Sequence, residues 1–224
     1  KLPGKFLFTK LRNWERTNDE LQNVLSLSLD KLNCSAVYGY LAHNADTLIE
    51  NPFLWETLLK AKAEKKINKI GFSLYSPEQL ERLIALNCIP DIVQLPYSIL
   101  DRKFANKFQV LKGFGTEIHV RSVFLQGLYF MDPEGLPEKL SDLKPALLEL
   151  HNICKENNVT VSDVALNYAV ANPFIDQVVI GVDTTAQLKE NIRAVSDWRP
   201  ENDLFARIET IAIKNKTLLN PVNW

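Results

Sequence analysis

Apolar runs of strand length alternate along the chain with stretches in which apolar residues recur every three or four positions. Short apolar runs are typical of buried strands, and the three-to-four spacing is typical of helices that cover a sheet. Strands are predicted at residues 6–11, 36–41, 69–73, 91–95, 117–123 and 177–182. Helices are predicted at residues 18–31 and 53–65, from Ser76 onward, near 101–111, and at 143–157, 161–171, 185–195 and 202–216. Residues 124–142, rich in Gly, Pro and Asp, are expected to form a long loop.

Strands followed by helix-length connections favour a parallel α/β sheet covered by helices. Because no linker or shift in composition divides the sequence, we expect a single domain over residues 1–224, with a C-terminal helix and tail from about residue 200. An open doubly wound sheet is the alternative to a barrel. That fold often carries GxGxxG after its first strand, and this sequence has none. The pattern therefore favours a barrel.

Polar residues stand where most of the predicted strands end. In a (β/α)8 barrel, the carboxyl ends of the strands surround the active site. The residues at these positions are Lys10, His43, Ser73, Gln94, Arg121, Ser122 and Gly181. They are the first candidates for a functional site.

The last predicted strand passes through Gly181 into a helix that Thr184 or Thr185 can cap. A helix N-terminus offers unpaired N–H groups and a positive dipole end to an anion. Gln187, Glu190 and Asn191 lie three or four residues apart, so they share one face of this helix. This segment could hold a phosphate, although an ordinary capped surface helix would show the same pattern.

Composition narrows the classes of function. The formal net charge is −1 and there is no basic tract, so binding to nucleic acid or to an anionic membrane has no electrostatic support. The three cysteines, Cys34, Cys88 and Cys154, are scattered and form no metal-binding pattern, and the three histidines form none either. We expect a protein without a metal, in the reducing cytoplasm.

Several segments taken together resemble the aldo-keto reductase family. These are Phe8-Thr9-Lys10, Leu41-Ala42-His43-Asn44, Lys69-Ile70-Gly71-Phe72-Ser73, Val93-Gln94-Leu95-Pro96-Tyr97, the run from Arg121 to Gly127, and Gly181 with Gln187, Glu190 and Asn191. The resemblance implies a (β/α)8 TIM barrel in which residues 6–11 are the third strand. The first two strands would then be missing, which corresponds to roughly 50–80 residues at ordinary element lengths.

The resemblance implies hydride transfer between a nicotinamide cofactor and a small carbonyl or alcohol substrate. Lys10 matches the family's lysine, which lowers the pKa of a catalytic tyrosine. His43 matches the histidine that orients the substrate carbonyl. The family's aspartate and tyrosine belong to the second strand and the following loop, and no residue of this sequence stands at their places.

The resemblance also assigns the cofactor contacts. Ser73 and Gln94 match residues that bind the nicotinamide amide, although Leu74 replaces the usual Asn. Arg121 matches the position that stacks on the nicotinamide ring. Ser122, Phe124 and Gln126 fall along the pyrophosphate path, and Gln187, Glu190 and Asn191 match adenosine contacts. Asp183 stands where some relatives carry an Arg for the 2′-phosphate of NADP, which indicates a preference for NAD.

Two other functions remain open at this point. A catalytically inactive, cofactor-binding regulatory or interaction protein would keep the barrel and explain Leu74. A barrel that acts on phosphorylated sugars would explain the polar strand ends but not the adenosine-binding face. Trp198 is expected to be a packing or surface aromatic, and the sequence does not indicate the substrate or the oligomeric state.

Overall fold

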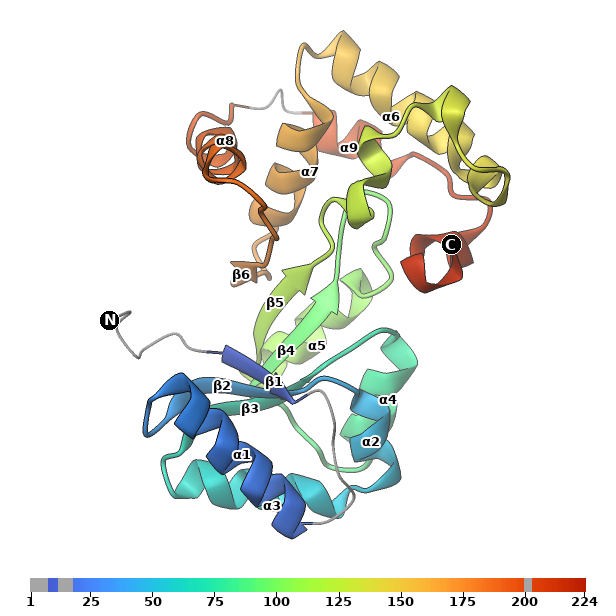
Figure 1. Cartoon of the computed structure of the whole chain (residues 1–224). Coiled ribbons are helices and arrows are strands. Elements are labelled where there is room, and N and C mark those ends of the chain that lie inside the picture. The colour runs from blue at the N-terminus through green and yellow to red at the C-terminus, as the bar shows by residue number, and fades with distance from the viewer. Residues whose placement is uncertain (1–7, 12–17, 200–202) are drawn as a thin grey trace. The chain divides into compact units, whose positions relative to one another are not determined.

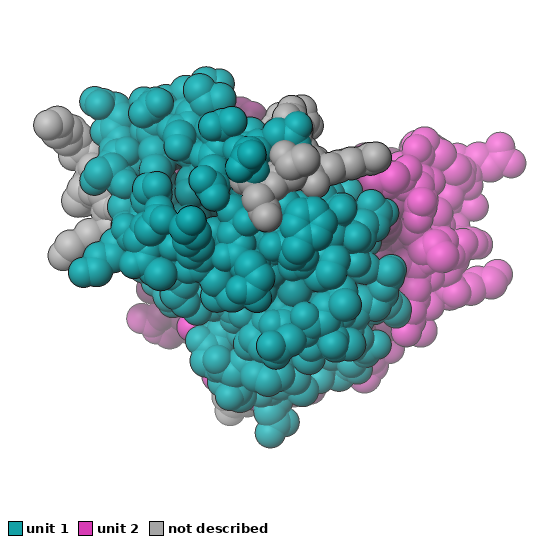
Figure 2. Space-filling view, turned by 90° about the horizontal axis from the view of Figure 1, so that it is seen from below, with its two compact units in different colours: residues 1–95, 106–119 teal, residues 96–105, 120–224 magenta. Residues whose placement is uncertain are grey.

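The computed structural model describes residues 8–11, 18–199 and 203–224, with the side chains described from residue 19 onward. The chain forms two compact units (Figure 2). Unit 1 comprises residues 1–95 and 106–119, and unit 2 comprises residues 96–105 and 120–224. No helix in the described ranges combines the length and the apolar character that a membrane crossing requires.

Parallel strands form the centre of unit 1 (Figure 1). They are β1 (Phe8–Leu11), β2 (Val37–Ala42), β3 (Ile67–Ser73) and β4 (Ile92–Pro96), paired in chain order. One row of Cα partners runs from Lys10 to Leu41, Gly71 and Ile92. Strand β5 (Glu117–Arg121) begins beside β4, where the N–H of Glu117 donates to the carbonyl of Asp91 at 2.9 Å.

The helices of unit 1 lie against this sheet through apolar faces. They are α1 (Asn18–Leu32), α2 (Ala45–Glu50), α3 (Phe53–Ala63), α4 (Pro77–Ala85) and α5 (Phe108–Gly113). Helix α1 buries Leu21, Leu25 and Leu29, one turn apart, as an amphipathic helix should. Ser76 and Gln79 form a capping box at the start of α4. The helix start predicted at Ser76 is therefore confirmed.

Gly71 allows β3 and β4 to approach closely. A Cβ atom built at this position would lie 1.7 Å from the carbonyl oxygen of Ile92, well inside van der Waals contact. Only a residue without a side chain fits here, so this glycine fixes the spacing of the two strands.

A charged cluster occupies the beginnings of the strands of unit 1. The Glu117 carboxylate accepts hydrogen bonds from the Tyr38 hydroxyl at 2.7 Å and from His119 Nε2 at 2.6 Å. It also pairs with the Lys69 ammonium, which lies over the Tyr38 ring at 5.4 Å from the centroid. Burial alone would raise the pKa of Glu117, but the hydrogen bonds from Lys69, His119 and Tyr38 outweigh it and lower the pKa to about 2. We call these four residues the Glu117 cluster.

Unit 2 contains the end of β5 and the short strand β6 (Gln177–Val178), joined by a hydrogen bond from the N–H of Val179 to the carbonyl of Val120 at 2.8 Å. Its helices are α6 (Lys144–Glu156), α7 (Val161–Val170), α8 (Thr185–Ser196) and α9 (Leu204–Glu209). Helix α7 packs against α8, and α6 packs against both α7 and α9 (Figure 1). Asn167 links α7 to α8 by donating to the carbonyl of Ala194 at 3.0 Å.

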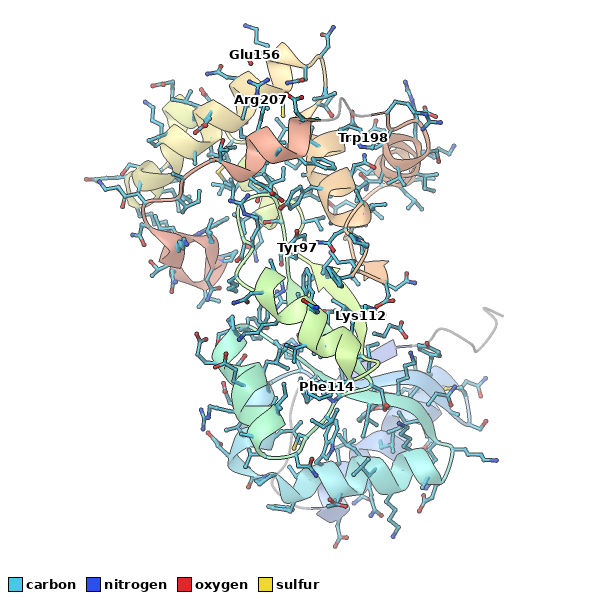
Figure 3. All side chains as sticks on the ribbon, turned by 180° about the vertical axis from the view of Figure 1, so that it is seen from behind. Tyr97, Lys112, Phe114, Glu156, Trp198 and Arg207 are labelled. Atoms are coloured by element: carbon cyan, nitrogen blue, oxygen red, sulfur yellow. The ribbon has the colours of Figure 1, made fainter. Side chains whose placement is uncertain are left out.

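A row of four aromatic rings runs through unit 2. Tyr97 stacks on Tyr168 with ring centroids 5.5 Å apart, and Tyr168 meets the edge of Phe205 at 5.4 Å. Phe205 in turn stacks on Trp198 at 6.0 Å and 16°. Asn172 holds the Tyr97 end by donating to its hydroxyl at 3.1 Å. Figure 3 labels the two ends of the row, Tyr97 and Trp198. We call these rings the aromatic row.

Most predicted elements appear with small shifts, but the helix predicted near residues 101–111 begins only at Phe108, as α5. Strands β2 to β5 fall within two residues of their predicted bounds, and Phe6 and Leu7 lie outside the described residues. Helix α2 was not predicted, and helix α9 ends at Glu209, seven residues before the predicted end. The predicted loop at residues 124–142 contains the short 3-10 segments Leu125–Phe130, Pro133–Gly135 and Glu138–Leu143.

Candidate functional site

The two catalytic candidates stand on neighbouring strands of unit 1. Lys10 lies in β1 with Leu41 as its Cα partner, and the Lys10 side chain falls outside the described part of the chain. His43 follows the last residue of β2 and is half-buried. Lys10 and His43 are therefore only two residues out of register across one strand pair, at the carboxyl ends of both strands.

Ser73 and Gln94, predicted to hold the nicotinamide amide, are Cα partners across β3 and β4. Ser73 is fully buried, and Gln94 is half-buried. Leu74, which replaces the usual Asn, is also buried, and its N–H donates to the carbonyl of Gln94 at 2.8 Å. The structure thus brings the predicted pair together, and the position of the missing amide is filled by an apolar core residue.

Most of the remaining cofactor candidates line one cavity of about 1050 Å³ in unit 2. The candidates in its wall are Ser122, Phe124, Gln126, Gly181, Asp183, Gln187, Glu190 and Asn191. They come from the segment after β5, the turn after β6 and one face of α8. The rings of Phe124 and Phe130, 5.7 Å apart, give the cavity an aromatic wall. Its size and mixed lining suit a ligand as large as a nucleotide.

Arg121 stands beside this group, at the last position of β5. Its guanidinium donates to the Ser122 hydroxyl at 3.3 Å, and its carbonyl accepts from the N–H of Tyr97 at 3.1 Å. Arg121 is half-buried. It is held next to the cavity wall through Ser122.

The backbone after β5 is held in a left-handed conformation. The φ angles are 63° at Ser122, 44° at Leu125, 51° at Gln126 and 85° at Gly127. Only Gly127 adopts such an angle without steric cost, and strain of this kind clusters at ligand-binding sites. Leu125, Gln126 and Gly127 are left-handed in succession, and the N–H groups of Leu125 and Gly127 donate to carbonyls of the same loop at 2.9 Å. The strained loop therefore adds to the case for a ligand-binding wall.

The N-terminus of α8 is closed by a capping box. Thr184 is the cap, as one of the two sequence alternatives predicted, and its hydroxyl accepts from the N–H of Gln187 at 3.2 Å. The Gln187 carboxamide oxygen accepts from the N–H groups of Asp183 and Thr184, at 2.7 and 3.3 Å. The oxygen of Gln187 is thus used within the protein, and its NH₂ group is the part that can donate to a ligand.

The other side of the cavity was not predicted as part of a site. It is lined by the turn before α7 and the start of that helix, and by the end of α8 and the residues after it, at Asn158, Val159, Thr160, Ser162, Asp163, Arg193, Ala194, Asp197, Trp198 and Arg199. Thr160 caps α7, since its hydroxyl accepts from the N–H of Asp163 at 3.0 Å. Trp198 stands two residues beyond the end of α8, so the helical spacing of Gln187, Asn191 and Ala194 did not point to it.

The cavity wall is more acidic than basic. Its carboxylates are Asp163, Asp183, Glu190 and Asp197, and its guanidinium groups are Arg193 and Arg199. Arg193 lies 3.4 Å from the carboxylate of Asp197, and Arg199 donates to the backbone carbonyls of Ser196 and Trp198. Within residues 8–11, 18–199 and 203–224, no cluster of His, Cys, Asp and Glu is arranged to hold a metal ion.

Solved structures of low sequence identity share this fold. An aldo-keto reductase from Bacillus halodurans in its holo form superposes with a TM-score of 0.77 and 23% identity, covering 92% of this chain and 72% of that protein. A variant of the protein Gox0644 in complex with NADPH superposes with a TM-score of 0.70 and 20% identity, covering 93% and 71%. The α/β architecture is thus that of the (β/α)8 barrel of the aldo-keto reductases, as predicted.

Two curated proteins of similar sequence are reductases. The chloroplastic pyridoxal reductase of Arabidopsis thaliana is 23% identical over 222 residues, 89% of this chain and 59% of that protein. The L-glyceraldehyde 3-phosphate reductase of Escherichia coli O157:H7 is 23% identical, with 83% and 61% covered. The chain thus spans about three-fifths of the length of these relatives. The model of the aldo/keto reductase family matches residues 4–213, nearly the whole chain, and the chain belongs to this family.

Proposed function

We propose that the protein is an NAD(P)-dependent oxidoreductase that transfers a hydride between a nicotinamide cofactor and a small carbonyl or alcohol substrate. The observation that carries this proposal is the convergence of the predicted pyrophosphate and adenosine contacts on one cavity of unit 2. The strained loop after β5 and the capped N-terminus of α8 both border that cavity. The N-terminus of α8 is suited to an anionic linker between a nucleoside and a second group.

Within this proposal, the residues of the chain bind three parts of the cofactor. Ser122, Gln126 and the α8 N-terminus bind the pyrophosphate, while Glu190 and Asn191 bind the adenosine. Ser73 and Gln94 hold the nicotinamide amide, and Arg121 stacks on its ring. The bound cofactor supplies or accepts the hydride.

Lys10 and His43 act on the substrate side. A lysine ammonium lowers the pKa of a neighbouring phenol toward the working pH, so that the phenol can exchange a proton with the substrate oxygen. The imidazole of His43, in its neutral form, can donate a hydrogen bond to that same oxygen and orient it. Their positions at the ends of paired strands support these roles.

We further propose a preference for NAD over NADP. The Asp183 carboxylate lines the cavity, and four carboxylates face two guanidinium groups in its wall. Both guanidinium groups have partners within the protein: Arg193 lies 3.4 Å from Asp197 in an exposed pair, and Arg199 donates to backbone carbonyls. Repulsion between a 2′-phosphate and one carboxylate at 4 Å is about 1 kcal/mol per unit charge in water-like surroundings, which corresponds to roughly fivefold in affinity. A free ribose 2′-OH would instead be a good donor to this carboxylate.

The test uses the full-length protein with NADH and NADPH. Calorimetric titration should give tighter binding of NADH, and cofactor oxidation should be seen with some members of a panel of aldehydes. Lys10→Met should abolish turnover while preserving NADH binding within about twofold. Normal aldehyde reduction by this variant would remove Lys10 from the mechanism, whereas binding without turnover in the wild type would indicate the regulatory alternative.

The cofactor preference is tested separately by Asp183→Asn, which should improve NADPH binding several-fold and change NADH binding little. Asp142→Asn is the matched control, because Asp142 is exposed in the same unit and lies outside the cavity wall. If the wild type binds NADPH more tightly than NADH, the proposed preference is wrong.

A further inference from the structure

Trp198 lies just beyond the end of α8, and its side chain is part of the wall of the unit 2 cavity. The cavity-lining residues of α8 include Gln187, Asn191 and Ala194, which lie three or four residues apart on one face of the helix. Trp198 follows two residues after Ser196, the last residue of α8, and lines the same cavity. Asn191 and Trp198 thus border one cavity whose size suits a nucleotide.

The indole of Trp198 is held in place before any ligand arrives. It stacks on Phe205 at 6.0 Å and 16°, and Phe205 is fixed by the edge-on contact with Tyr168. Tyr168 is anchored by its hydroxyl, which donates to the Glu209 carboxylate at 2.7 Å. Figure 3 shows Trp198 between α8 and α9, at the end of the aromatic row. A preorganised ring loses little conformational entropy when it binds a ligand.

Trp198 contacts both the aromatic row and the cavity. Phe205 covers one face, and Nε1 is shielded from solvent without a hydrogen-bond partner among the described residues. Trp198 is nevertheless half-exposed and lines the cavity. The surface that Trp198 presents to the cavity is therefore apolar and aromatic. Such a surface suits the π-face of a nucleic base, which stacks on aromatic side chains.

We propose that Trp198 is a binding residue for the purine ring of the cofactor, which stacks on the indole from the cavity side. This inference rests on the proposed function and adds to it a residue that fixes the adenine end of the ligand. Phe205, the indole and the purine would then form a continuous stack. Glu190 and Asn191, on the same face of α8, would contact the polar parts of the same nucleoside.

The test compares three probes, NADH, ADP-ribose and reduced nicotinamide mononucleotide, which lacks the adenosine part. Calorimetry on the full-length protein should show that Trp198→Ala weakens NADH and ADP-ribose binding by roughly 10- to 100-fold, the range for loss of one base–aromatic stack. Binding of reduced nicotinamide mononucleotide should not change. Trp198→Phe keeps a ring in the stack and should restore most of the affinity.

Fluorescence gives a second measurement that does not depend on a destabilising substitution. ADP-ribose should quench the tryptophan fluorescence of the wild type, and Trp198→Phe should lose most of that quenching. Trp55→Phe is the control, because Trp55 is buried against Phe72 in unit 1, and it should keep the quenching.

Two outcomes overturn the inference and are distinguishable. Equal ADP-ribose affinity in the wild type and in Trp198→Ala rejects the stacking role and leaves the proposed function standing. Failure of the wild type to bind either NADH or ADP-ribose rejects the proposed function, and the stacking role with it.

Discussion

Neutralising the carboxylate of the Glu117 cluster should destabilise unit 1 strongly. The side chain of Glu117 is only 13% exposed, and its two oxygens accept from Tyr38, Lys69 and His119. These contacts lower its pKa from 4.5 to about 2 against the effect of burial. At 1.36 kcal/mol per unit, the ionised carboxylate stabilises the fold by about 3 kcal/mol near neutral pH. Glu117→Gln should lose most of that amount.

The assay is urea unfolding followed by circular dichroism. With a slope of about 2–3 kcal/mol per molar urea for a chain of this size, the midpoint should fall by about 1 M. Glu81→Gln is the matched control in the same unit. Glu81 pairs with Lys107 at 2.5 Å but is 58% exposed, and such surface pairs contribute about 0–1 kcal/mol.

The effect of Glu117→Gln should also depend on pH in a defined direction. Because the folded pKa lies below the ordinary value of 4.5, the carboxylate contributes fully above about pH 5. That contribution is lost as the pH falls toward 2, so the difference between wild type and variant should shrink on acidification. A midpoint shift near zero at pH 7, or a difference that grows on acidification, would refute the reasoning.

Three further changes have expected results on stability. Gly71→Ala should destabilise the fold by about 3 kcal/mol or more, because the new methyl group would overlap the carbonyl of Ile92. Gly113 lies in a helix with open space around it, so Gly113→Ala should be neutral or should stabilise the fold by up to about 1 kcal/mol. The melting temperatures of the two glycine variants test this argument, and equal shifts in both would contradict it. Thr184→Ala removes the capping box that orients the cavity wall, so it should lower the free energy of unfolding by about 1 kcal/mol and weaken NADH binding. An unchanged NADH affinity in a titration would show that the cap does not contribute to cofactor binding. Tyr129→Phe removes a fully buried hydroxyl that hydrogen-bonds a serine at 2.8 Å, and should cost about 1–3 kcal/mol in denaturant unfolding.

The order of the elements could be predicted because the parallel strands are nearly continuous apolar runs. Helix α2 was missed because six residues carry too little periodicity to distinguish a helix from a loop. Strand β6 is shorter than the apolar run 177–182 because the backbone turns there into the capping box of α8. Val179 and Val182 are consequently about 40% exposed, although their residue type is typical of a strand.

Those parts of the candidate site that form a pattern within one segment of the sequence could be predicted. The polar ends of strands and the face of α8 with Gln187, Glu190 and Asn191 could be identified from spacing within one segment. The opposite wall, at Asn158 to Asp163, depends on α7 packing beside α8, which no local pattern encodes. The strained backbone of the loop after β5 could not be predicted either, because Ser and Gln, the residue types at positions 122 and 126, rarely adopt positive φ.

Among the residues that the structure describes, those lining the cavity in unit 2 all lie between Ser122 and Arg199, in one stretch of the polypeptide. The two substrate-side candidates, Lys10 and His43, come from outside that stretch. A chimera that exchanges this stretch for the corresponding part of a relative should therefore carry over the donor's choice of dinucleotide, while the range of accepted aldehydes stays with the recipient. Cofactor preference and substrate range could then be changed independently of each other.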